Sequence, residues 1–114
     1  MRKLSAGMDT NILEFIRSCV RQRRIYWTYH VNMRLKGRFI PREIILRSAD
    51  TYEIIEGYPK DRYLPSYLVY AEYEKDIIHI HIAADVKNKS ITVITAYRPS
   101  TDKWEKDFKT RKKR

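Results

Sequence analysis

His30, Arg34 and Arg38 are the residues whose types and spacing first suggest chemistry. They stand at i, i+4 and i+8, so in a helix they form one polar stripe. Imidazole titrates near neutral pH, and guanidinium groups bind phosphate oxygens through paired hydrogen bonds. The stripe is therefore a candidate phosphate-binding surface. A solvated helix face without a chemical role fits the same spacing, and both interpretations stay open at this point.

The composition favours an anionic partner. The chain has 114 residues and a formal net charge of +10, with nine Tyr and two Trp among the charges. Such a surface suits nucleic acid, because the cations bind phosphates and the aromatic rings stack on bases. No apolar run approaches the roughly 20 residues needed to cross a bilayer, and we find no signal peptide. The single Cys19 excludes an internal disulfide, so we expect a cytoplasmic protein without a membrane partner.

Helical periodicity governs the first half of the chain. A first helix is predicted from a cap at Asp9 or Thr10, after a frayed segment over residues 1–8. A second helix, capped by Thr28, carries the polar stripe and turns Val31 and Leu35 inward. A short third helix spans about residues 41–48, because proline suits a first helical turn. The segment 25–27 is predicted to be a short extended link.

Alternation replaces helical periodicity from residue 51 onward. Four strands are predicted, over residues 51–58, 67–73, 77–86 and 90–98. The short turns between the later strands imply antiparallel neighbours. Strict alternation in the last strand places Tyr97 on the same face as Ile91 and Val93. The predicted fold is one α+β domain over residues 1–114, with two to three N-terminal helices on a four-stranded antiparallel sheet.

The residues after the last strand are predicted to form a packed turn followed by a tail. Residues 101–108 are expected to form a helical turn that anchors Trp104 and Phe108. Residues 109–114 are expected to form a basic tail that adds nonspecific affinity for nucleic acid.

Six landmarks occur in order between about residues 28 and 111. They are the His30, Arg34, Arg38 and Ile40 series, the segment 54–59, the pair Ile78-His79, Asp85, the segment 95–99, and Trp104 with Arg111. In this order the chain resembles the domain-of-unknown-function family 4258, which is similar to the RelE/ParE and BrnT toxins. The family pattern prefers glycine where this chain has Phe39, so the turn after Arg38 departs from it.

The resemblance implies a RelE-like fold and the toxin of a toxin–antitoxin pair. Such a toxin acts as an endoribonuclease on mRNA, including mRNA bound to the ribosome. Similar proteins are often encoded beside a zinc-finger antitoxin resembling MqsA. The implied partners are therefore RNA and a cognate antitoxin of that type.

RNA cleavage without a metal suits the residues that the landmarks contain. The RNA 2′-hydroxyl is the nucleophile, so the protein needs only an acid, a base and cations for the phosphate charge. We assign His30, His79 and Tyr97 as the catalytic candidates. The phosphate-binding candidates are Arg34, Arg38, Arg98 and Arg111. We expect no cofactor and no metal, since the carboxylates scatter and no glycine-rich phosphate loop occurs.

Several alternatives stay open for the same residues. His79 and His81 share a strand face and would ligate a metal if His30 and carboxylates from other segments completed the site. His79 would otherwise be a hydrogen-bonded histidine at a helix–sheet interface, and Tyr97 would pack in the core. At the level of the whole protein, the alternatives are a non-catalytic nucleic-acid-binding domain that uses the same basic face, and a basic protein that binds an acidic protein partner.

Overall fold

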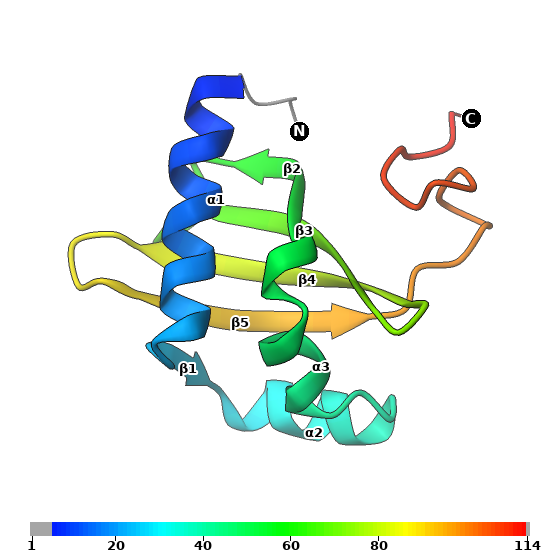
Figure 1. The fold of residues 1–114 in the computed structure, drawn as a ribbon, viewed down its shortest axis with the longest axis horizontal. Coiled ribbons are helices and arrows are strands. Elements are labelled where there is room, and N and C mark those ends of the chain that lie inside the picture. Colours follow the sequence, from blue (N-terminus) through cyan, green and yellow to red (C-terminus); the bar gives the residue numbers. More distant parts are fainter. Residues whose placement is uncertain (1–5, 114) are drawn as a thin grey trace.

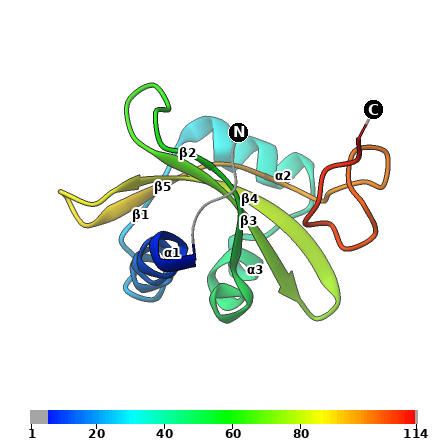
Figure 2. The same cartoon turned by 90° about the horizontal axis from the view of Figure 1, so that it is seen from above.

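The computed structural model describes residues 6–113, and the side chains of residues 11–113. It is an α+β fold in which three helices accompany one five-stranded mixed sheet (Figure 1). Helices α1 (Ala6–Arg21) and α3 (Arg42–Arg47) lie together on one side of the sheet (Figure 2). Helix α2 (Tyr29–Gly37) lies along the β5 edge of the sheet (Figure 1).

The sheet has the strand order β1-β5-β4-β3-β2. Its four longer strands are β2 (Glu53–Tyr58), β3 (Ser66–Tyr73), β4 (Asp76–Asp85) and β5 (Ser90–Tyr97). These form the predicted antiparallel meander. The fifth strand, β1 (Ile25–Trp27), pairs in parallel with β5, so the prediction of a four-stranded antiparallel sheet was wrong in this respect. The predicted link is a strand because Ile25 and Trp27 pack against the core beside Ile91 and Val93.

One hydrophobic core fills the space between the helices and the sheet. The fully buried side chains include Ile16 and Val20 of α1, Val31 of α2 and Ile45 of α3. They meet alternate residues of the central strands, which are Tyr67, Val69, Ala71, Ile78, Ile80, Ile82, Ile91, Val93 and Ala96. The opposite side of the sheet, which we call the distal face, carries Leu68, Tyr70, His79, His81, Thr95 and Tyr97. This face bears the polar groups discussed below.

Helix α1 starts earlier than predicted. It begins at Ala6, so Asp9 and Thr10 lie within the helix rather than at its cap. Part of the predicted frayed segment, residues 1–5, lies outside the described residues. The helix ends where Arg23 adopts a left-handed conformation with φ of 61°. Arg24 N then donates to the Cys19 carbonyl and Arg23 N to that of Val20, the hydrogen-bond pair of a Schellman ending.

Helix α2 has the predicted cap and inward face. The Thr28 side chain accepts from Val31 N, and Val31 and Leu35 are buried. The helix ends in a second Schellman motif, in which Phe39 occupies the left-handed position with φ of 55°. The family pattern prefers glycine at this position, and glycine adopts the left-handed conformation without strain. Phe39 adopts the same conformation here, so the turn keeps its geometry although the residue departs from the pattern.

The C-terminal segment forms turns rather than the predicted helical turn. Trp104 is buried as expected and forms an isolated antiparallel bridge with Arg111. Lys109 Nζ lies 2.7 Å from Glu53, and Arg111 binds Glu56, so both side chains are attached to β2. The segment lies beside one end of the sheet, away from α1 (Figures 1 and 2).

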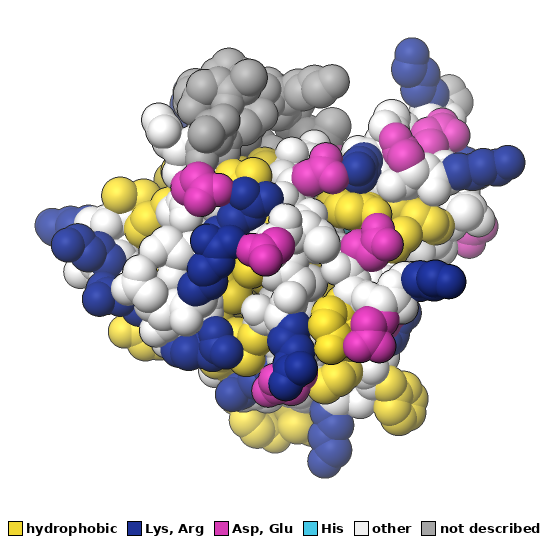
Figure 3. Space-filling model, viewed as in Figure 1, with side chains coloured by type: hydrophobic (Ala, Val, Ile, Leu, Met, Phe, Trp, Pro, Cys, Tyr) yellow, Lys and Arg dark blue, Asp and Glu magenta, His cyan; other side chains and the backbone are white. Residues whose placement is uncertain are grey.

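The basic side chains do not form one continuous patch on the face with α1 and α3. Figure 3 shows Lys and Arg spread over this face with acidic side chains among them. Several of these cations are paired, as in Arg17–Glu14, Arg21–Asp50 and Arg47–Glu43. In the described part of the chain, no helix has the length and apolar character needed to cross a membrane.

Candidate active site

A β-bulge brings Tyr97 to the face of the sheet that carries His79. The ladder between β4 and β5 shifts register at His81/Ile82, where Ile94 is an extra residue on β5. Ile91 and Val93 face the core before the bulge, whereas Tyr97 pairs with His79 after it. The prediction that Tyr97 shares a face with Ile91 and Val93 was therefore wrong, because one added residue reverses the alternation.

The Tyr97 hydroxyl and His79 form a hydrogen-bonded pair. Tyr97 Oη lies 3.3 Å from His79 Nδ1, and His79 Nε2 lies 2.6 Å from the Phe108 carbonyl oxygen. A carbonyl only accepts, so Nε2 carries the hydrogen and Nδ1 accepts from the tyrosine. Burial lowers the pKa of His79 and raises that of Tyr97, which favours the neutral form of both. His79 is fully buried, with Trp104 edge-on at 4.5 Å between ring centroids.

The outer side of Tyr97 lines a pocket of about 380 Å³. The other lining residues are Arg98, Pro99, Ser100, Lys103, Trp104 and Arg111. Three cations thus surround a hydroxyl and an indole ring. Such a pocket suits a phosphate group that carries an attached base or sugar.

Arg111 is held in this pocket by a buried carboxylate. Its Nε lies 2.5 Å and its Nη2 3.1 Å from the two oxygens of Glu56, whose side chain is only 2% exposed. Tyr58 donates a further hydrogen bond to Glu56. The guanidinium also stacks on Trp104, with Cζ 4.7 Å from the ring centroid. The hydrogen bond to Glu56 raises the pKa of Arg111, so the cation is fixed in charge and in place.

Arg98 and Arg38 connect the pocket to helix α2. Arg98 binds Asp76 through Nε at 3.0 Å and Nη2 at 2.9 Å, and it also donates to the backbone carbonyls of Arg38 and Phe39. Arg38 Nη1 donates to the Ala96 carbonyl at 2.7 Å. Arg38 therefore holds the strand next to Tyr97, and it does not line the pocket.

The structure brings together some of the predicted site residues and separates others. Tyr97, Arg98 and Arg111 line one pocket, and His79 contacts it through Tyr97. His30 and Arg34 lie on the exposed face of α2 and do not line this pocket. Figure 3 shows hydrophobic side chains along the margin where α2 lies, and Tyr29 and Met33 are exposed there. This part of α2 is thus a mixed aromatic and basic surface.

His81 has a separate set of partners on the distal face. Its Nε2 lies 2.9 Å from Ser66 Oγ, which donates to Asp61 at 2.5 Å. Burial lowers the pKa of His81, and Tyr58 lies edge-on to its ring. Within the part of the chain that the structure describes, no three potential metal ligands form a group. The alternative of a metal site formed by His30, His79 and His81 is therefore not supported.

Sequence reasoning missed Glu56 and Lys103 as members of the site. Glu56 lies in the landmark segment 54–59, follows a bulge in β2 and precedes Gly57, but it was assigned no role from the sequence. Lys103 lies in a segment without periodicity. An acidic residue on a strand that otherwise faces the core is a further sequence signal that points to Glu56.

Comparisons with known proteins identify one family. The family model described as "Domain of unknown function (DUF4258)" matches residues 27–98, which is more than half of the chain and includes both Tyr97 and Arg98. No curated protein and no solved structure matches the chain.

Proposed function

The chain belongs to the DUF4258 family, and from this premise we propose that it is the toxin of a toxin–antitoxin pair. In this proposal it has a RelE-like fold and acts as a metal-independent endoribonuclease on mRNA. The observation that carries the proposal is the Tyr97 hydroxyl, which contacts His79 at the edge of a pocket lined by Arg98, Lys103 and Arg111. The toxin role and the antitoxin partner rest on the resemblance to RelE/ParE and BrnT proteins.

The proposed reaction starts at the 2′-hydroxyl of a nucleotide bound in the pocket. Its proton passes to Tyr97 Oη while the tyrosine proton moves to His79 Nδ1. The Phe108 carbonyl then stabilises the resulting imidazolium through Nε2–H. The 2′-oxygen forms a bond to phosphorus, the bond to the 5′-oxygen breaks, and Lys103 protonates the leaving oxygen. The products are a 2′,3′-cyclic phosphate and a 5′-hydroxyl.

The cations stabilise the charge that develops on the phosphorane. Arg98 and Arg111 are fixed by Asp76 and Glu56, so they need little reorganisation during the reaction. In this scheme His30 and Arg34 contact RNA outside the reaction site. Of the three catalytic candidates, His79 and Tyr97 therefore keep the acid–base role in this scheme and His30 does not.

One observation favours a second candidate, a non-catalytic RNA-binding domain. His79 is fully buried and both of its ring nitrogens have protein partners, as in a structural histidine. The exposed face of α2 would then bind RNA through His30 and Arg34, with Tyr29 as a stacking platform. This candidate predicts salt-sensitive binding without cleavage.

The test is an RNA cleavage assay with purified protein in the presence of EDTA. We expect single-stranded RNA to be cut with 2′,3′-cyclic phosphate ends. An oligonucleotide of the same sequence with 2′-deoxyribose at every position should bind and stay intact. His30→Ala should retain cleavage. RNA that is bound but uncut would favour the second candidate and overturn the enzymatic proposal.

A further inference from the structure

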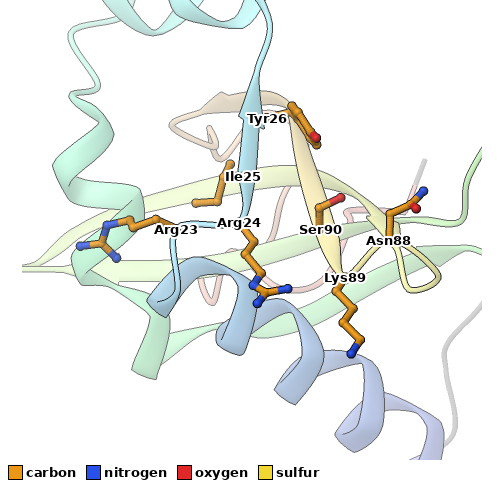
Figure 4. A pocket seen from close by; sticks show the side chains of 7 residues that line it. All are labelled: Arg23, Arg24, Ile25, Tyr26, Asn88, Lys89 and Ser90. Atoms are coloured by element: carbon orange, nitrogen blue, oxygen red, sulfur yellow. The ribbon is translucent and has the colours of Figure 1, made fainter.

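A second basic pocket lies at the opposite end of β5 from Tyr97. It has a volume of about 330 Å³ and is formed by the link that follows α1, the start of β1, the turn before β5 and the first residue of β5 (Figure 4). Its lining residues are Arg23, Arg24, Ile25, Tyr26, Asn88, Lys89 and Ser90. None of these residues belongs to the site around Tyr97.

Two of the cations in this pocket have no anionic partner among the described residues. Arg24 and Lys89 are exposed and form no ion pair with a described carboxylate. Both also line a neighbouring pocket beside Cys19. In Figure 4 their side chains extend in the same direction, toward α1, whereas Arg23 points elsewhere. Arg23 donates to the Val20 carbonyl at 2.8 Å and thus closes the helix end.

The backbone holds Arg24 and Lys89 in fixed positions. The Arg24 carbonyl accepts from Ile91 N at 3.0 Å, which ties the residue to β5. Lys89 has φ of 54° in the tight turn after Val86, and its N donates to the Val86 carbonyl at 3.2 Å. Two cations that extend from fixed backbone positions and line the same pocket suit an anion that reaches both.

We infer that this pocket binds a backbone phosphodiester of single-stranded RNA, and that it forms a second contact for the RNA whose cleavage occurs at Tyr97. The inference rests on the proposed function and adds how the substrate is held. The exposed ring of Tyr26 and the polar groups of Asn88 and Ser90 fit a nucleotide better than a bare ion. Strand β5 has eight residues and is about 25 Å long, Tyr97 lies on the distal face, and Arg24 and Lys89 extend toward α1. Only an extended RNA strand that passes around the edge of the sheet therefore reaches both pockets.

The test compares the affinity for long and short oligonucleotides. Fluorescence anisotropy is measured at several salt concentrations with single strands of about ten and of about three nucleotides. They carry 2′-deoxyribose at every position, so that the wild-type protein binds them without cutting them. Arg24→Gln and Lys89→Gln are the test variants. Lys87→Gln is the matched control, because Lys87 is an exposed cation of the same turn that lines neither pocket. Thermal unfolding verifies that each variant is folded.

Each test variant should weaken binding of the long strand by about threefold to fivefold. The slope of log affinity against log salt should fall by about one. Binding of the short strand and the behaviour of Lys87→Gln should stay at the wild-type level. Inorganic phosphate that competes as well as the long strand would indicate a site for free phosphate and overturn the inference.

The inference and the proposed function fail in different ways. If the wild-type protein binds and cuts long RNA while Arg24→Gln, Lys89→Gln and Lys87→Gln bind equally well, only the second contact is wrong. If the wild-type protein neither binds nor cuts RNA, the proposed function and the inference are both wrong.

Discussion

Glu56 is the residue on which the geometry of the candidate site depends most. It is a buried carboxylate in a sheet whose other face is apolar, and burial of an unpaired charge would cost several kcal/mol. Arg111 neutralises it with two hydrogen bonds, and Tyr58 donates a third. Burial raises the pKa of Tyr58 to about 12, so the tyrosine remains a donor. The pair fixes both the C-terminal segment and one cation of the pocket.

Removal of Arg111 should leave Glu56 buried without its counter-ion. We expect Arg111→Gln to lower the free energy of unfolding by about 1–3 kcal/mol. Breaking a fully buried ion pair would lower it more, but this arginine is half exposed. Glu56→Gln combined with Arg111→Gln should recover part of this loss, since the unpaired charge is then absent. Lys112→Gln serves as the control in urea unfolding. An Arg111→Gln variant as stable as this control would contradict the role of the pair.

At the scale of elements, α2 is attached to the sheet edge through its C-terminal end. Strand β1 pairs with the first half of β5, and α2 packs against β5 beyond it. Arg38 and Arg98 form reciprocal contacts there: Arg38 donates to the Ala96 carbonyl, and Arg98 donates to the Arg38 carbonyl at 2.8 Å. The end of α2 thus determines where the strand that carries Tyr97 lies.

The two arginines of the α2 stripe should therefore differ in their effect on stability. Arg38→Gln removes hydrogen bonds to Ala96 and Thr95 and should lower the free energy of unfolding by about 1–2 kcal/mol. Arg34→Gln changes an exposed side chain one helical turn before Arg38 and should alter the free energy of unfolding by less than about 0.5 kcal/mol. Equal effects of the two substitutions in thermal unfolding would show that Arg38 does not attach α2 to β5.

The turn after α2 offers a substitution that should stabilise the protein. Phe39 is 84% exposed and has a left-handed backbone, which costs an L-residue about 1 kcal/mol. Phe39→Gly should raise the free energy of unfolding by about 0.5 kcal/mol, because the relief of strain exceeds the added entropy of the unfolded chain. Phe39→Ala keeps the strain and should show no gain. A Phe39→Gly variant less stable than Phe39→Ala would contradict this account.

At the scale of the whole molecule, the sequence predicted the regular elements well. The helical periodicity around Val31 and Leu35, the Thr28 cap and the alternation in β3 and β4 all match the structure. These patterns are visible because one face of each element packs on the core. The order of landmarks assigned seven residues to one site, and three of them, Tyr97, Arg98 and Arg111, line one pocket.

The parts that the sequence did not predict depend on long-range packing. Strand β1 has three residues, too few for a pattern, and it pairs with a strand more than 60 residues away. The bulge at Ile94 lies between Val93 and Thr95, and β-branched residues such as these fit either face of a strand. The C-terminal segment has no periodicity, because its position comes from Trp104 and from ion pairs with β2. His30 was grouped with His79 because both are landmarks of the family pattern. The order of landmarks along the chain does not give the distance between two residues in space.

Stability should fall at mildly acidic pH because buried histidines resist protonation. Burial lowers the pKa of His79 and of His81 in the folded state, so the unfolded chain, with histidine pKa near 6.5, binds more protons. The free energy of unfolding should be highest above about pH 7 and decline as the pH falls toward about 5. Equilibrium unfolding across this range measures the slope.

Substitution of one histidine at a time identifies the source of this slope. His79→Gln should be less stable than wild type at pH 7.5 but should lose stability less steeply as the pH falls. The exposed His30 provides the control, and His30→Gln should keep the wild-type slope. If His79→Gln also keeps the full slope, the buried histidine does not explain the pH dependence.

The most direct test of the central claim is the cleavage rate of Tyr97→Phe. This substitution removes the hydroxyl that contacts His79 and leaves the aromatic ring in place. Single-turnover cleavage of RNA with EDTA should slow by about 100-fold or more, because the proton transfer is lost, while RNA affinity stays close to that of wild type. Tyr63→Phe removes the hydroxyl of an exposed tyrosine in the loop before β3 and should cleave at the wild-type rate. A Tyr97→Phe variant that also cleaves at the wild-type rate would contradict the assignment of Tyr97 and His79 as the catalytic pair.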